Sequence, residues 1–168
     1  FPVGGRFSGP QRDIYACVLA AQAAAIAAVK PGADWNAPHE AAVRVLCEGL
    51  RDLKILPGSL EEILASQSYR RYYMHRTGHW LGLDVHDVGD YKVDDQWRVL
   101  EPGMVLTIEP GIYVPDDETV PAQFRGIGIR IEDDVLVTRD GADVLTAAAP
   151  KRIDDVEAVM RAVGRARA

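Results

Sequence analysis

Two histidines and a glutamate in the middle of the chain have the side-chain chemistry to bind a divalent metal ion or a polar substrate. His79 opens the stretch HWLGLDVHDVG, in which an apolar run separates it from a second histidine, His86. Glu109 follows the apolar run VLTI and directly precedes Pro110-Gly111. Burying an ionised carboxylate is costly unless a cation or several hydrogen-bond donors meet it. We therefore expect Glu109 to face such a partner.

A second glutamate comes from the stretch GIGIRIEDDVLV. In a continuous strand, alternation places its isoleucines on one face and Arg130 beside Glu132 on the other. This pattern fits a salt bridge on a solvated sheet face as well as a functional site. Together, His79, Glu109 and Glu132 form a candidate ligand set for Zn, Mn, Fe or Co, without the thiolates of a structural zinc site.

Whether the two histidines share a site depends on the backbone between them. If residues 79–85 form a strand, His79 shares its face with Leu81 and Leu83, and His86 points the other way. The turn-forming residues that follow His86 can supply a bend near Asp84. The sequence leaves both arrangements open.

The elements that must position these residues are helices first and strands later. The spacing of apolar residues predicts helices at residues 11–29, 37–53, 60–67 and 154–163. Ser59 is the expected N-cap of the third helix, with Glu62 in the capping-box position. Alternating apolar segments predict strands at residues 72–74, 79–85, 104–114 and 128–137. This order indicates an α+β fold with antiparallel strands and flanking helices.

Size and composition limit the class of protein. A chain of 168 residues with 48% hydrophobic and 26% charged residues is enough for one domain. The net charge of −6 argues against nucleic-acid binding, and no apolar run is long enough to span a membrane. Cys17 and Cys47 have no metal-ligand spacing, so we expect buried thiols, a reducing compartment and a cytoplasmic location.

Three blocks of the sequence resemble consecutive blocks of the Xaa-Pro aminopeptidases (aminopeptidase P). They are GHWLGLDVHDVG, LEPGMVLTIEPGIY and FRGIGIRIEDDVLVT. That family shares the pita-bread fold with prolidase, creatinase and methionine aminopeptidase. The opening FPVGGRFSGPQRDIYACVLAAQ resembles the segment that follows the family's first two metal-binding aspartates. The resemblance implies that residues 1–168 are one partial catalytic domain, the carboxy-terminal portion of the fold. The strands with those aspartates and the amino-terminal domain would be missing.

The resemblance also implies roles for six residues. The implied metal ligands are His79, Glu109 and Glu132, which in the complete site hold two divalent ions, Mn in most members, with Co or Zn also suited. His86 matches a histidine that contacts the substrate, and His75 matches another that lines the pocket. Arg130 would orient the carboxylates. The sequence assigns no role to Tyr113.

The implied activity is release of the first residue from peptides with proline second, by metal-activated hydroxide. Other implied partners are the missing amino-terminal portion and further copies in a homo-oligomer. The isolated chain would be inactive and would hold at most one ion, weakly. Two alternatives in the superfamily are a prolidase, which prefers dipeptides, and a non-catalytic peptide-binding module. A plain α+β domain with surface acids is favoured if Glu109 and Glu132 are exposed and more than about 8 Å apart.

Overall fold

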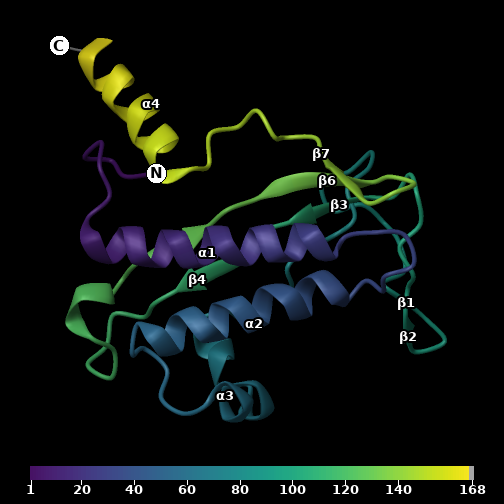
Figure 1. Ribbon diagram of the computed structural model, residues 1–168, viewed down its shortest axis with the longest axis horizontal. Coiled ribbons are helices and arrows are strands. Elements are labelled where there is room, and N and C mark those ends of the chain that lie inside the picture. Colours follow the sequence, from purple (N-terminus) through teal and green to yellow (C-terminus); the bar gives the residue numbers. More distant parts are fainter. Residues whose placement is uncertain (167–168) are drawn as a thin grey trace.

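The computed structural model describes the backbone of residues 1–166 and the side chains of residues 1–162 (Figure 1). Four α-helices and two 3-10 helices are present in this part of the chain: α1 Gly9–Ala28, α2 Ala37–Asp52, α3 Leu60–Ser66, α4 Ile153–Ala166, η1 Ser68–Arg71 and η2 Ala122–Phe124. Seven short strands accompany them: β1 Lys92–Val93, β2 Gln96–Trp97, β3 Val105–Ile108, β4 Gly111–Tyr113, β5 Gly128–Arg130, β6 Asp133–Val137 and β7 Ala142–Val144. The prediction of an α+β fold is confirmed.

The helix boundaries follow from local capping. At the start of α1, Ser8 and Gln11 form a capping box, in which each side chain bonds to the backbone N–H of the other residue. Ser59 and Glu62 form the predicted capping box at the start of α3. Pro10 and Pro38 lie in the first turns of α1 and α2, where a missing N–H costs nothing. All four predicted helices are therefore present, with ends that differ by a few residues.

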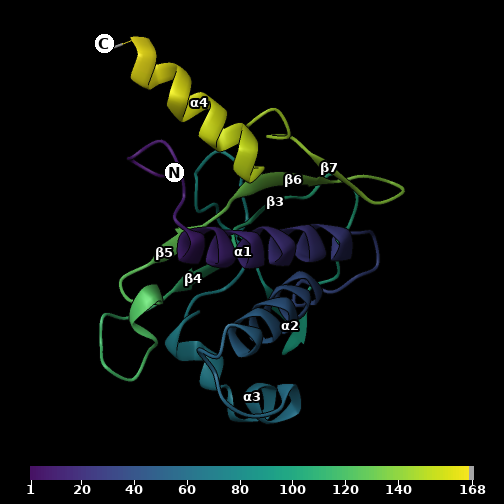
Figure 2. The same ribbon diagram turned by 60° about the vertical axis from the view of Figure 1, so that its left-hand side comes forward.

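The helices α1 and α2 lie side by side over the strands and bury the main core between them and the sheets (Figures 1 and 2). Gly49 of α2 permits this close approach, because a Cβ there would lie 2.1 Å from the Cys17 sulfur of α1. Both cysteines are free and lie on these two packed helices. Burial raises the pKa of the Cys17 thiol to about 12 and that of Cys47 to about 11. Cys47 is buried as expected, whereas Cys17 is only partly buried, and it packs against the core.

The last helix, α4, begins close to the start of α1 and extends away from the sheets (Figures 1 and 2). The buried carboxylate of Glu157 accepts a hydrogen bond from the backbone N–H of Phe7 at 3.1 Å and pairs with Arg12 at 2.8 Å. The segment before α4 is fixed by Lys151, whose ammonium lies 2.8 Å from the buried carboxylate of Asp133. No described helix combines the length and apolar character needed to cross a bilayer.

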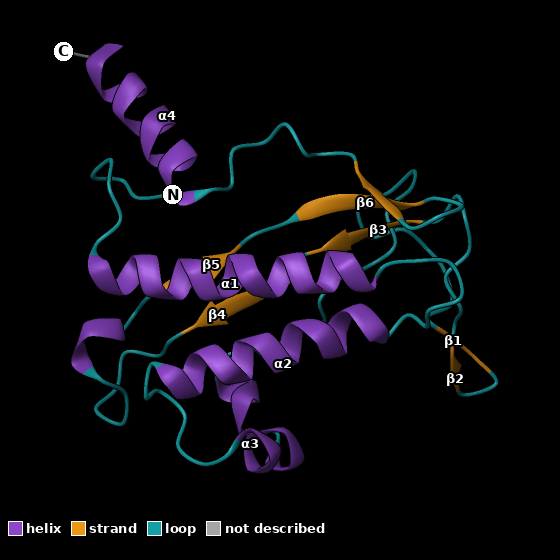
Figure 3. Ribbon diagram, in the orientation of Figure 1, coloured by secondary structure: helices purple, strands orange, loops and turns teal. Residues whose placement is uncertain are grey.

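Antiparallel pairing organises the strands into three small sheets (Figure 3). β3 pairs with β6, which also pairs with β7, while β4 pairs with β5 and β1 with β2. Two segments that were each predicted as one strand form two strands instead. Residues 104–114 divide into β3 and β4, and residues 128–137 divide into β5 and β6. Pro110 explains the first division, because a proline has no N–H to give to a ladder. Its carbonyl still accepts a bond from Ile131 at 3.3 Å.

Two further predicted strands are wrong as strands. Residues 72–74 follow η1 without forming a strand, and residues 79–85 contribute only an isolated bridge between Trp80 and Leu106. After Leu81 the chain turns, with bonds from Gly82 N–H to the carbonyl of Asp84 and from Asp87 N–H to that of Trp80. The bend that the sequence left open near Asp84 is therefore present.

The hairpin of β1 and β2 was not predicted. Asp94 and Asp95 form its two-residue turn, with positive φ angles of 48° and 64°. Strand β7 and the two 3-10 helices were also not predicted.

Candidate metal centre

The break in the long antiparallel ladder places two glutamates opposite each other. On one side of the break Ile108 pairs with Asp133, and on the other Gly111 pairs with Arg130. Counting inward from either pair sets Glu109 opposite Glu132. Neither residue belongs to a strand, so both side chains leave the backbone where the regular pairing stops.

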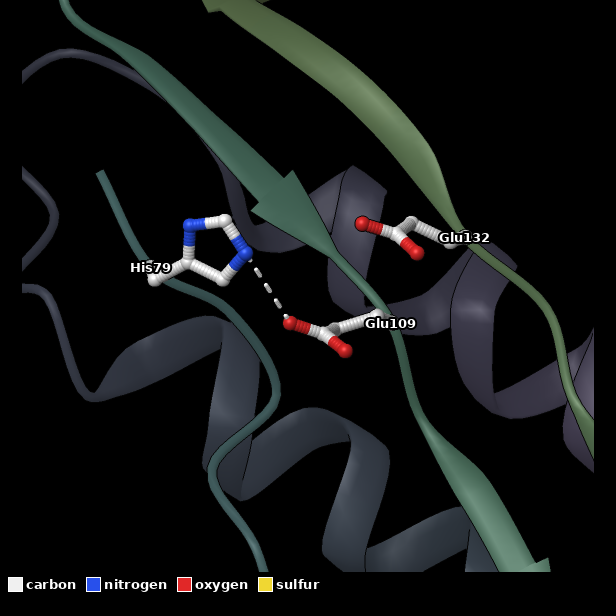
Figure 4. Close-up of side chains that lie close together, drawn as sticks. All are labelled: His79, Glu109 and Glu132. Atoms are coloured by element: carbon white, nitrogen blue, oxygen red, sulfur yellow. Dashed lines mark ion pairs between the residues drawn. The ribbon is translucent and has the colours of Figure 1, made fainter. Parts of the chain in front are cut away.

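His79 completes a cluster of three potential metal ligands (Figure 4). One ligand atom from each of His79, Glu109 and Glu132 lies within 4.8 Å of the other two. The Nε2 atom of His79 is 3.4 Å from Oε1 of Glu109, and Glu109 is only 9% exposed. This geometry argues against the plain domain with surface acids, which needed two exposed and distant glutamates.

Hydrogen bonds orient the His79 ring toward the carboxylates. Its Nδ1 lies 2.9 Å from the carbonyl oxygen of Trp80, and a carbonyl can only accept. The proton is therefore on Nδ1, and in the neutral ring the lone pair of Nε2 faces Glu109. A lone pair and a carboxylate oxygen at this distance need a cation or a proton between them. The donor set thus fits a divalent ion.

The close approach of the His79 segment to β3 depends on Gly78. A Cβ at this position would lie 2.0 Å from the carbonyl oxygen of Thr107, too close for any side chain. The backbones are joined by bonds from Thr107 N–H to the carbonyl of His79 and from Glu109 N–H to that of Thr77, at 3.0 and 2.6 Å. The hydroxyl of Thr107 accepts from His79 N–H and donates to Glu109. These contacts fix both ligand candidates relative to β3.

His86 lies next to this cluster because of the turn after Leu81. Its ring centroid is 4.2 Å from that of His79, with the two rings inclined by 63°. His86 is not among the three clustered ligand candidates. The two histidines therefore share one site, and only His79 is positioned among the carboxylates.

His75, Tyr113 and Arg130 form a connected group beside Glu109. The hydroxyl of Tyr113 lies 2.9 Å from His75 Nε2 and accepts a bond of 2.6 Å from Arg130 Nε. Nη1 of Arg130 is 3.3 Å from the second carboxylate oxygen of Glu109. No role was assigned to Tyr113 from the sequence. The available signal was its place close to Glu109 in the block LTIEPGIY.

A cavity of about 480 Å³ opens onto these groups. Five of the six predicted site residues line it: His75, His79, His86, Glu109 and Arg130. Sequence reasoning missed the rest of its lining, which includes the aromatic residues Trp35, Tyr91 and Trp97 together with Arg76. The sixth predicted residue, Glu132, is not part of this lining but lies within the cluster. The cavity combines an apolar wall with a polar, charged base.

The carboxylates of Glu109 and Glu132 are close enough for the charge of one to affect the pKa of the other. Partial burial raises the pKa of the Glu132 carboxyl, and the neighbouring negative charge of Glu109 raises it further. Two carboxylates held together in this way favour either a shared proton or a bound cation.

Comparison with known proteins identifies the family. The sequence model of metallopeptidase family M24 matches residues 1–139, so the chain belongs to that family. The Xaa-Pro aminopeptidase of Haemophilus influenzae is 52% identical over 160 residues, which are 95% of this chain and 37% of that relative. This match confirms the resemblance drawn from the three sequence blocks.

Solved structures of related proteins have the same fold. Pseudomonas aeruginosa aminopeptidase PepP has a TM-score of 0.96 and 54% sequence identity, covering 98% of this chain and 38% of that chain. A zinc-substituted Escherichia coli aminopeptidase P in complex with product has a TM-score of 0.92 and 47% identity, covering 96% and 37%. The predicted pita-bread fold is thereby confirmed. The chain spans somewhat more than a third of the length of these proteins.

Proposed function

We propose that this chain is the carboxy-terminal part of the catalytic domain of an Xaa-Pro aminopeptidase. The observation that carries the proposal is the convergence of His79, Glu109 and Glu132 within 4.8 Å at the ladder break. The relatives named above, all aminopeptidases, support the peptidase class over a binding module. Their names also favour an aminopeptidase over a prolidase.

The three clustered residues would hold divalent metal, with Glu132 shared between two ions in the complete enzyme. Three donors leave room for other ligands, which the remainder of the longer protein would supply. On its own, the chain would hold at most one ion, weakly, and would be inactive. Imidazole with two carboxylates suits manganese, our expected native metal, and also cobalt or zinc. When bound, the ions supply Lewis-acid activation of the scissile carbonyl and of the attacking water.

The chain's own residues would recognise and polarise the bond before proline. That bond is a tertiary amide without an N–H, so recognition depends on shape and on the carbonyl oxygen. His86 lines the cavity beside the ligand cluster and would donate a hydrogen bond to the developing oxyanion. One glutamate of the cluster would carry a proton to the departing proline nitrogen.

The group of His75, Tyr113 and Arg130 would keep the Glu109 carboxylate in position. Arg130 contacts Glu109 directly, and the Tyr113 hydroxyl ties the guanidinium to His75. Groups that orient metal ligands in this way strengthen metal binding and activity. We also propose a cytoplasmic location, for which the two free cysteines are the support.

The test is Glu132→Ala in the full-length protein. We expect loss of Xaa-Pro hydrolysis together with loss of bound metal, measured by peptide cleavage and by metal analysis of the purified protein. Glu101→Ala, which alters an exposed loop glutamate outside the cluster, is the matched control. Full activity of Glu132→Ala would refute the shared-ligand role and with it the proposed mechanism.

A further inference from the structure

A second cavity adjoins the candidate metal centre. It has a volume of about 650 Å³ and lies between the start of α2, α3 and the segment around η1. Arg76 and Trp97 line both this cavity and the one that contains His79 and Glu109. The two cavities therefore meet at Arg76 and Trp97, and Arg76 borders both of them.

The second cavity is positively charged in a chain whose net charge is −6. Its lining contains three arginines, Arg44, Arg70 and Arg76, against one glutamate, Glu40. No ion pair is formed by these arginines within the described side chains, residues 1–162. We call this surface, defined by the three arginines, the arginine groove. Its guanidinium groups have donors free for an anion.

Arg76 is held in place at the junction of the two cavities. Its guanidinium lies over the Trp97 ring, 4.8 Å from the ring centroid, and donates a hydrogen bond to Asn36. His39, which also lines the groove, adds no positive charge near neutral pH, because burial and then the charge of Arg76 lower its pKa to about 4. The positive charge of the groove thus comes from its three arginines.

The proposed activity determines which part of a substrate can reach this groove. An enzyme that removes one residue accepts only that residue on the amino side of the cut bond. A cavity of this size next to the site is therefore available to the residues that follow proline. In a short peptide, those residues end in a carboxylate within a few residues of the cut, at about 3.3 Å of reach per residue.

We propose that the arginine groove binds a carboxylate of the leaving peptide, and so selects substrates that carry negative charge after proline. This inference rests on the proposed function. It adds the group that would determine which residues the enzyme prefers after proline. The carboxylate is either the terminal carboxylate of a short peptide or an acidic side chain after proline. Both bind through the same bidentate contacts with arginine.

The experiment measures kcat/KM of the full-length protein on two matched peptide pairs. The first pair is Ala-Pro-Gly with a free terminal carboxylate and the same peptide as its amide. The second pair, both amides, is Ala-Pro-Asp and Ala-Pro-Asn. We expect the charged member of at least one pair to be preferred by about tenfold, and the preference to fall with added salt. The pair that shows the preference identifies the source of the carboxylate.

The variants are Arg70→Gln and Arg76→Gln, with Arg71→Gln as control. Arg71 is adjacent to Arg70 in the chain but pairs with Asp117 and does not line the groove. We expect each groove variant to reduce the preference by about threefold, with most of the change in KM, and the control to retain it.

The results separate this inference from the proposed function. If the wild type cleaves all four peptides without preference, or the groove variants keep the wild-type preference, the inference is wrong and the proposed function stands. If no Xaa-Pro peptide is cleaved, the proposed function fails and the inference fails with it.

Discussion

Arg130 reaches Glu109 across the β4–β5 pair, with 3.3 Å between its Nη1 and the carboxylate Oε2. Arg130 pairs with Gly111, which has no side chain to stand between them. A Cβ on Gly111 would lie 2.7 Å from the Tyr113 hydroxyl that receives the Arg130 Nε bond. The small residue after Pro110 thus leaves the space in which the guanidinium, the phenol and the carboxylate meet.

The first prediction concerns Arg130→Gln in the full-length protein. Because the variant removes the cation that faces Glu109, we expect metal affinity or kcat to fall by about 10- to 100-fold. Arg130→Lys will not restore the wild-type value, since an ammonium cannot contact Tyr113 and Glu109 in the same planar geometry. Peptide cleavage and metal titration measure both quantities. Arg139→Gln, an exposed arginine elsewhere, is the control, and an unchanged Arg130→Gln would contradict the prediction.

A second prediction separates the two neighbouring histidines. His86→Ala should lower kcat by about 100-fold while the metal content stays near that of the wild type, because His86 lies outside the ligand cluster. His79→Ala should lose metal as well as activity. Metal analysis beside steady-state kinetics distinguishes the two. Loss of metal from His86→Ala would make that residue a ligand.

A third prediction concerns the buried carboxylate of Asp133, which is 1% exposed. It is balanced by the Lys151 ammonium at 2.8 Å and by the Thr146 hydroxyl at 2.6 Å. Lys151→Met leaves a buried charge without its cation, so we expect the free energy of unfolding to fall by about 3 kcal/mol. Urea unfolding measures this change.

Lys30→Met is the control for Lys151→Met, because Lys30 is exposed and should change stability by less than about 0.5 kcal/mol. Adding Asp133→Asn to Lys151→Met should recover part of the loss, since the uncompensated charge is then absent. Equal stability of the two lysine variants would show that the buried pair contributes nothing.

A fourth prediction follows from His39, whose pKa is lowered from 6.5 to about 4 by burial first and by the charge of Arg76 second. Between these pH values the unfolded chain binds a proton that the folded chain does not. Stability should therefore fall as pH drops through this window, by up to about 3 kcal/mol from this residue. His39→Gln, which keeps an amide able to bond to Thr77, should flatten the dependence. Urea unfolding of the wild type and of His39→Gln at pH 7 and at about pH 4.5 tests this. An equal change in the free energy of unfolding between the two pH values for both proteins would contradict it.

Much of the fold could be predicted because its signals are local. Capping residues such as Ser59 and prolines such as Pro38 set the helix starts wherever they occur. The order of helices and strands then indicated the α+β fold class. The ladder break was not predicted, because apolar residues continue on both sides of Glu109 and of Glu132, although Pro110 and Asp133 interrupt the alternation there. A period-two pattern reports which side a residue faces and not whether its backbone is paired.

The candidate site was predictable in its residues and not in its surroundings. His79, Glu109 and Glu132 were found because metal ligands are few in kind and came in recognisable blocks. Arg76 and Trp97 come from a loop and a hairpin that meet only in three dimensions. The turn of that hairpin uses Asp94-Asp95 in place of the usual Asn-Gly, so the sequence carried no clear signal for it.

The ladder break would also link the stability of the fold to the proposed metal ion. On either side of Pro110 lie strands of three to five residues, and the bond from Ile131 N–H to the carbonyl of Pro110 lies at the break between them. An ion bound by both Glu109 and Glu132 would connect the two paired segments at this break. The melting temperature of the full-length protein should then rise with the concentration of free metal and drop on chelation, and Glu109 and Glu132 would contribute to the cohesion of the sheet as well as to the proposed activity.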